Sequence, residues 1–107
     1  MVQLECDCNE RCDAKINSYN AFIELYNFFE FSTQNNIFEE VTVKYPYTVS
    51  ESHGNKIKYY ATKWYRCKSC GCFWEFVYPD FPSNGYVRKF DYNNYTQIPY
   101  KWDGLII

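Results

Sequence analysis

The segment at residues 63–78 reads KWYRCKSCGCFWEFVY, and this stretch decides the expected fold. Aromatic residues lie on both sides of a Cys-x-x-Cys-Gly motif, which predicts two strands joined by a tight turn. Two thiolates at this spacing can bind one tetrahedral ion, and Gly71 permits the positive φ that such a turn uses. We therefore expect a strand–turn–strand unit with a structural zinc ion at the turn.

The rest of the chain predicts one helix and further strands. Apolar residues at helical spacing indicate a helix over residues 13–31, with Asp13 as its cap. Alternating patterns predict strands at residues 41–45, 56–66, 73–78, 86–92 and 96–102, with a hairpin turn at 52–55 and a loop at 79–85. The 107 residues allow a single core. We expect one α+β domain, residues 1–107, in which one amino-terminal helix packs on an antiparallel, zinc-stapled sheet of four to five strands.

A structural zinc site needs four ligands, so two must come from the amino-terminal cysteines. The pair Cys8-x-x-x-Cys12 has a suitable spacing and ends where the helix is expected to start. The predicted ligands are Cys8, Cys12, Cys67 and Cys70, with Cys6 as the substitute. Cys72 is expected to be a buried thiol, and His53, the single histidine, an exposed turn residue. Disulfides or six ordinary buried thiols are the alternatives.

The cellular compartment helps to choose between a metal site and disulfides. No apolar run approaches the roughly 20 residues that span a bilayer, and the amino terminus lacks the basic start and apolar stretch of a signal peptide. These features predict a cytoplasmic protein without a membrane segment. Cytosolic thiols are kept reduced, which favours a metal over disulfides.

Catalysis is not expected. One histidine and four scattered glycines offer neither a catalytic triad nor a phosphate-binding loop. The formal charge of −2 divides into −6 over residues 1–40 and +4 over residues 41–107. Two binding surfaces therefore compete: the acidic first half, with its aromatic helix, and a basic, aromatic stripe in the second half. That stripe comprises Lys56, Lys58, Tyr60, Trp64 and Arg66, together with Lys68. It could hold phosphates and stack bases, or be an ordinary solvated sheet face.

A longer pattern gives a family resemblance. In residues 63–82 a Trp leads into C-x-x-C-G, an aromatic strand and a Pro-Asp-Phe-Pro loop; Cys6-x-Cys8-x-x-x-Cys12 and a helix precede it. With this arrangement the chain resembles small bacterial immunity proteins of polymorphic and contact-dependent toxin systems, over residues 6–30 and 60–90. The resemblance implies an antitoxin that binds and neutralises a cognate toxin, often a nuclease with a basic cleft, by protein–protein occlusion.

Acidic, aromatic surface suits that role, because charge complementarity speeds capture and aromatic rings anchor a complex. The expected partner-binding acids are Glu24, Glu30, Glu39, Glu40 and Asp80. We expect a monomer or weak dimer. The alternatives are a zinc-ribbon-like module that binds single-stranded nucleic acid and a zinc-stapled subunit of a larger assembly.

Overall fold

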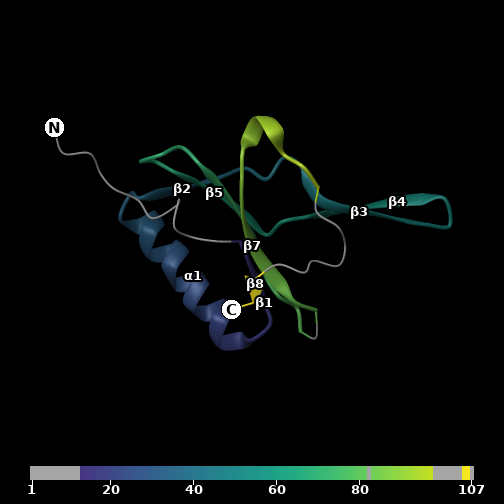
Figure 1. Ribbon diagram of the computed structural model, residues 1–107, viewed down its shortest axis with the longest axis horizontal. Helices are drawn as coiled ribbons and strands as arrows, with labels where there is room; N and C mark the ends of the chain where they lie inside the picture. Colours follow the sequence, from purple (N-terminus) through teal and green to yellow (C-terminus); the bar gives the residue numbers. More distant parts are fainter. Residues whose placement is uncertain (1–12, 82, 98–104, 107) are drawn as a thin grey trace.

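The computed structural model describes residues 13–81, 83–97 and 105–106, and shows one helix against a sheet from which a two-stranded arm projects (Figure 1). The coarse α+β class is therefore as expected. The elements are β1 (Ala14–Ile16), α1 (Tyr19–Gln34), β2 (Phe38–Val41), β3 (Pro46–Ser52), β4 (Asn55–Tyr60), β5 (Lys63–Cys67), β6 (Phe73–Val77), β7 (Gly85–Phe90), the 3-10 turn η1 (Tyr92–Asn94) and β8 (Leu105–Ile106).

The main sheet has six strands, in the order β2-β5-β6-β7-β1-β8. Its neighbours pair antiparallel except β1 and β8, which are parallel. The expected meander is present in β5, β6 and β7. The sheet is larger than the four to five strands expected, because β1 and β8 extend it beyond β7. The predicted strand at 96–102 lies mostly outside the described residues.

The helix begins later than the sequence predicts. Ser18, and not Asp13, caps α1: the Ser18 hydroxyl accepts a hydrogen bond from the Ala21 amide at 3.2 Å. Asp13 instead accepts a hydrogen bond from the amide of Lys89 at 2.8 Å. Residues 14–16 form β1 because Ala14 and Ile16 bury their side chains in the core.

The predicted long strand at residues 56–66 is wrong. It is two strands in two sheets, β4 in the arm and β5 in the main sheet. The chain turns at Ala61, which is buried, and at Thr62, whose amide donates to the Phe76 carbonyl at 3.0 Å. The predicted strand at 41–45 is likewise replaced by β2 and β3. The expected hairpin turn is present at the tip of the arm, where His53 and Gly54 have φ of 52° and 80°.

The main sheet buries side chains on both faces. On the helix side, Phe29 of α1 stacks on Tyr65 of β5, with ring centroids 4.5 Å apart and planes 11° apart. On the other side, Trp64 packs against Phe90 at 4.8 Å and against Tyr95 at 5.3 Å. The central strands β6 and β7 are therefore almost wholly buried.

A buried carboxylate lies within the second face. Glu75 is fully buried, and its Oε1 accepts hydrogen bonds from the Tyr86 hydroxyl at 2.6 Å and from Arg88 Nε at 3.2 Å. Its Oε2 accepts from Trp64 Nε1 at 3.2 Å and from the Tyr95 hydroxyl. Arg88 Nη2 lies 3.2 Å from Oε1 as an ion pair, without the geometry of a hydrogen bond. Arg88 thus balances the charge of Glu75.

Candidate functional site

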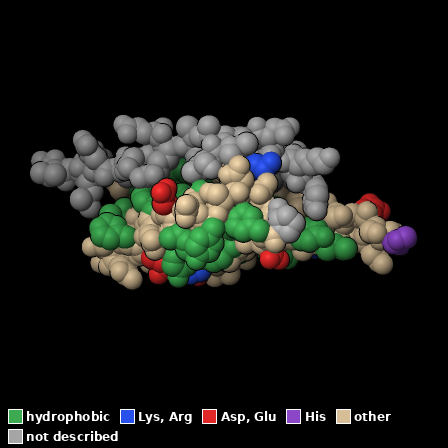
Figure 2. Space-filling view, turned by 90° about the horizontal axis from the view of Figure 1, so that it is seen from below, with side chains coloured by type: hydrophobic (Ala, Val, Ile, Leu, Met, Phe, Trp, Pro, Cys, Tyr) green, Lys and Arg blue, Asp and Glu red, His purple; other side chains and the backbone are tan. Residues whose placement is uncertain are grey.

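Four aromatic rings form a connected surface between α1 and the end of β6. Phe22 contacts Tyr19 at 6.4 Å, Tyr26 at 6.0 Å and Tyr78 at 5.0 Å, all between ring centroids, and Tyr26 contacts Tyr78 at 6.1 Å. Tyr19 and Tyr26 are exposed. Figure 2, the view from below Figure 1, shows several patches of hydrophobic side chains on one face of the molecule, with a few acidic and basic side chains at their edges.

Two of the predicted acids meet beside these rings. Lys63 Nζ lies 3.4 Å from Glu40 Oε1 and 3.8 Å from Glu30 Oε1. Burial lowers the pKa of Lys63, but the interactions of its amine with Tyr78, Glu40 and Glu30 together outweigh burial and raise the pKa overall. These five residues, Tyr26, Tyr78, Glu30, Glu40 and Lys63, are called the tyrosine–glutamate patch below.

The other three predicted acids lie elsewhere. Glu39 is on the opposite face of β2 from Glu40, where it pairs with Arg66 Nη2 at 3.1 Å. Glu24 is exposed on α1. Asp80 is in the β6–β7 loop and exchanges backbone hydrogen bonds of 3.0 and 2.8 Å with Ser83. The structure thus brings together two of the five acids.

The basic stripe is not formed as a continuous surface. Lys56, Lys58 and Tyr60 are exposed on the arm, whereas Trp64 is fully buried under the rings of the second core face. Arg66 is in the ion pair with Glu39. The expected stripe was wrong because it required one strand across residues 56–66.

The described cysteines have three different environments. Cys67 is fully buried in the core under α1, Cys70 is exposed and Cys72 is half-buried, less than expected. The Cys70 and Cys72 sulfurs lie 3.2 Å apart. Cys6, Cys8 and Cys12 lie outside the described residues. Within residues 13–81, 83–97 and 105–106, no three His, Cys, Asp or Glu side chains gather as a metal site. The proposed fourfold ligand set thus stays a prediction.

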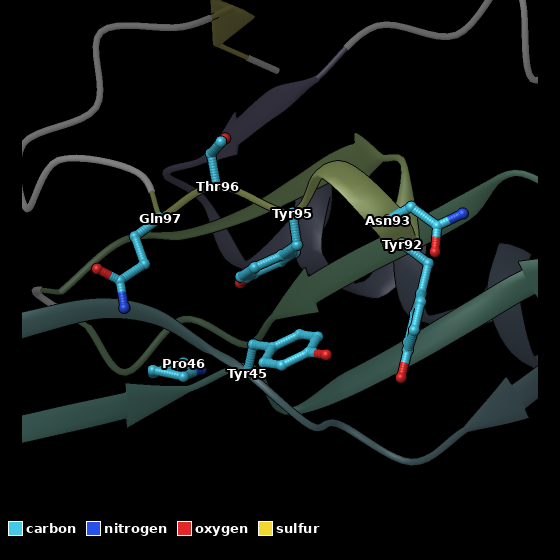
Figure 3. A pocket seen from close by; sticks show the side chains of 7 residues that line it. All are labelled: Tyr45, Pro46, Tyr92, Asn93, Tyr95, Thr96 and Gln97. Carbon is cyan, nitrogen blue, oxygen red and sulfur yellow. The ribbon is translucent and has the colours of Figure 1, made fainter.

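A hollow on the other side of the sheet was missed by the sequence reasoning. It measures about 650 Å³, and its lining is Tyr45, Pro46, Tyr92, Asn93, Tyr95, Thr96 and Gln97 (Figure 3). Tyr45 and Tyr95 are stacked, with centroids 5.6 Å apart. Lys44 lies over the Tyr92 ring and lowers the pKa of its hydroxyl through a hydrogen bond. The only sequence signal was the Tyr-Asn-Asn-Tyr segment at 92–95.

Comparison with known proteins assigns the chain to no family. No protein-family model, curated protein or solved structure matches the chain. Among the described residues, no helix is long and apolar enough to cross a membrane.

Proposed function

We propose that this chain is an immunity protein, a non-catalytic domain that binds a cognate bacterial toxin and occludes it. The observation that carries the proposal is the tyrosine–glutamate patch. It places two tyrosine rings next to two carboxylates on the surface of the body. Tyrosine is enriched among the residues that dominate binding energy at protein interfaces, and carboxylates complement the basic cleft of a nuclease.

Contacts within the chain hold the side chains of the patch. Phe22 supports the rings of Tyr26 and Tyr78 from between them. Lys63 holds Glu30 and Glu40 close together from β5. Because these contacts restrain the patch side chains, they lose less conformational entropy when a partner binds. This arrangement supports tight capture by a small surface.

The electrostatic part of the proposal rests on Glu30 and Glu40. Both are partly exposed, so a cation from the toxin can join or replace Lys63. A net charge of −2 further favours the approach of a basic toxin domain. The pair of Glu39 and Arg66, on the opposite face of β2, offers a matched control at similar exposure.

The first test is whether a toxin domain is encoded immediately upstream; such a domain then serves as the titrant in calorimetry. Glu30→Gln and Glu40→Gln should each weaken binding and reduce the dependence of the affinity on salt. Glu39→Gln should leave both unchanged. Equal effects of all three variants would remove the patch from the interface, and absence of any binding to that domain would refute the immunity function.

The proposal includes a cytoplasmic location, where the toxin would be met and where thiols stay reduced. The nucleic-acid alternative has less support, because burial of Trp64 interrupts its surface. A gel-shift assay with single-stranded oligonucleotides at low salt tests this alternative. Retardation that Lys56→Ala and Lys58→Ala abolish would favour nucleic-acid binding over the immunity function.

A further inference from the structure

The hollow on the sheet face opposite α1 is a surface that the proposed immunity function does not use. Its volume of about 650 Å³ lies within the range of about 300–1,000 Å³ that is typical of small-molecule sites. Tyr45 stacks on Tyr95 at 5.6 Å and lies 5.9 Å from Tyr92, both between ring centroids. All three rings contact the buried Trp64, at centroid distances of 5.3 to 6.3 Å. The hollow therefore has an aromatic wall anchored in the core.

Polar side chains lie at both ends of this aromatic wall. Figure 3 shows Gln97 near Pro46 at one end, and Asn93 near Tyr92 at the other. Thr96 adds a hydroxyl group to the lining, and all three of these polar residues are exposed. Amide and hydroxyl side chains can both donate and accept hydrogen bonds. The hollow thus combines flat apolar ring faces with neutral groups of both hydrogen-bonding kinds.

The buried Glu75 network restrains one side of the hollow. The Tyr95 hydroxyl donates to Glu75 Oε2, and the Arg88 guanidinium lies over the Tyr95 ring, with Cζ 4.7 Å from the ring centroid. Arg88 Nη1 also donates to the backbone carbonyl of Thr96. Because these contacts restrain the Tyr95 ring and the backbone that follows it, less conformational entropy is lost when a ligand binds against them.

Two charged side chains next to the hollow are engaged within the chain. Lys44 lies over the Tyr92 ring, 5.6 Å from its centroid, and hydrogen-bonds its hydroxyl. Asp91 accepts hydrogen bonds from the backbone amide of Asn93 at 3.0 Å and from Asn94 Nδ2 at 3.2 Å. Of the lining residues that the structure describes, none is charged. The hollow therefore favours a neutral ligand over a phosphate or a carboxylate.

We propose that this hollow binds a neutral saccharide, with a sugar ring on the tyrosine rings and its hydroxyls hydrogen-bonded to Asn93, Thr96 and Gln97. The C–H bonds of a pyranose ring face are positively polarised and match the negative face of an aromatic ring. Sugar hydroxyls donate and accept hydrogen bonds, as the amide and hydroxyl side chains of the lining do. Proline-rich segments also dock in aromatic grooves, but a proline residue offers only a carbonyl acceptor. The site is separate from the tyrosine–glutamate patch and stands whether or not a toxin is bound.

The first experiment locates the site by amide chemical shifts of the isotope-labelled full chain. The probes are cellotriose and triacetylchitotriose, whose equatorial substituents leave the ring faces apolar. Millimolar saccharide should cause saturable shifts centred on residues 44–46 and 91–97, and none at the patch residues Tyr26 and Tyr78. Absence of shifts with both saccharides, or shifts only outside the hollow, would overturn the proposal. Shifts at the hollow with a polyproline peptide or a nucleoside, and none with saccharides, would replace it.

The second experiment repeats the titration with paired variants. Tyr45→Ala should weaken saccharide binding by about 10-fold. Tyr59→Ala on the arm should leave binding unchanged, although the two tyrosines have similar exposure, 43% for Tyr45 and 37% for Tyr59. If Tyr45→Ala fails to fold, the exposed amides decide: Asn93→Ala should weaken binding by about 5-fold, and Asn94→Ala, whose side chain bonds to Asp91, should not. Equal affinities of the folded members of each pair would overturn the site.

Discussion

Trp64 donates a hydrogen bond of 3.2 Å from its indole Nε1 to Oε2 of Glu75, on the sheet face opposite α1. Both side chains are fully buried. The bond fixes the indole inside the domain, so it is not available to stack on a nucleic-acid base. It also makes Glu75 the centre of a polar network that ties β5, β6 and β7 together.

The Glu75 network predicts a strong dependence of stability on this carboxylate. Glu75→Ala leaves the guanidinium of Arg88 buried without its counter-charge, so the free energy of unfolding should fall by about 3–5 kcal/mol. The control is Glu39→Ala at the partly exposed pair with Arg66, where a loss of about 0–1 kcal/mol is expected. Urea denaturation followed by tryptophan fluorescence measures both. Equal losses would show that the buried network adds no more stability than the partly exposed pair.

The buried tyrosines predict destabilisation at alkaline pH. Burial and the Glu75 carboxylate raise the pKa of Tyr86, and burial and the hydrogen bond to Glu75 raise the pKa of Tyr95, both above the ordinary value of 10.0. The unfolded chain therefore loses these protons first, and stability is full below pH 10 and falls as pH rises beyond it. Each such tyrosine contributes a slope of about 1.4 kcal/mol per pH unit.

The variant Tyr86→Phe isolates one of these contributions. The informative range is about pH 10.5 to 11.5, which lies above the ordinary tyrosine pKa of 10.0. There the free energy of unfolding should fall less steeply with pH for Tyr86→Phe than for the unmodified chain. The two slopes should differ by about 1.4 kcal/mol per pH unit. The two slopes should coincide near neutral pH, where Tyr86 keeps its proton in both states. Parallel curves at alkaline pH would mean that Tyr86 ionises alike when folded and unfolded.

Two phenylalanines on α1 should differ sharply in their contribution to stability. Phe29 is buried and stacked on Tyr65, so Phe29→Ala should reduce the free energy of unfolding by about 3–5 kcal/mol. Phe31 is 62% exposed on the same helix, so Phe31→Ala should change it by less than about 0.5 kcal/mol. Chemical denaturation compares them directly. Similar losses would contradict the orientation of α1 on the sheet.

Close backbone packing at the start of β7 gives a further prediction. A Cβ atom at Gly85 would lie 2.2 Å from the Val77 carbonyl oxygen and 2.6 Å from the Pro79 nitrogen. Because both are backbone atoms, Gly85→Ala must displace the strand, and a loss of at least about 1–3 kcal/mol is expected from overpacking. Thermal unfolding measures it. An unchanged melting temperature would show that the β6–β7 contact is looser than described.

Local sequence signals predicted the local parts of the fold. The aromatic strands around the Cys-x-x-Cys-Gly motif correspond to β5 and β6, and the helical periodicity to α1. The misplaced features depend on distant residues. Asp13 is held by the amide of Lys89, and the break between β4 and β5 is held by the carbonyl of Phe76. No pattern within a short window contains either contact.

The candidate sites likewise contain features that local sequence predicts and features that depend on distant residues. Neighbouring residues of a strand point to opposite sides of its sheet, so the separate ion pairs of Glu39 and Glu40 follow from their adjacency alone. The sequence could not show that Tyr26 meets Tyr78, because this contact needs α1 packed across β6. Nor could spacing alone show which thiols of residues 67–72 lie outside the core, since burial of Cys67 depends on β2 and α1.

The central proposal is that the tyrosine–glutamate patch binds a cognate toxin, and one calorimetric comparison tests this proposal most directly. A toxin domain found to be encoded immediately upstream is titrated with the unmodified chain, with Tyr78→Ala, and with Tyr60→Ala, a control on the arm that is 51% exposed. Tyr78→Ala should lose at least about 2 kcal/mol of binding free energy, about 30-fold in affinity, with Tyr60→Ala unchanged. Loss of affinity in Tyr60→Ala with full affinity in folded Tyr78→Ala would contradict the account.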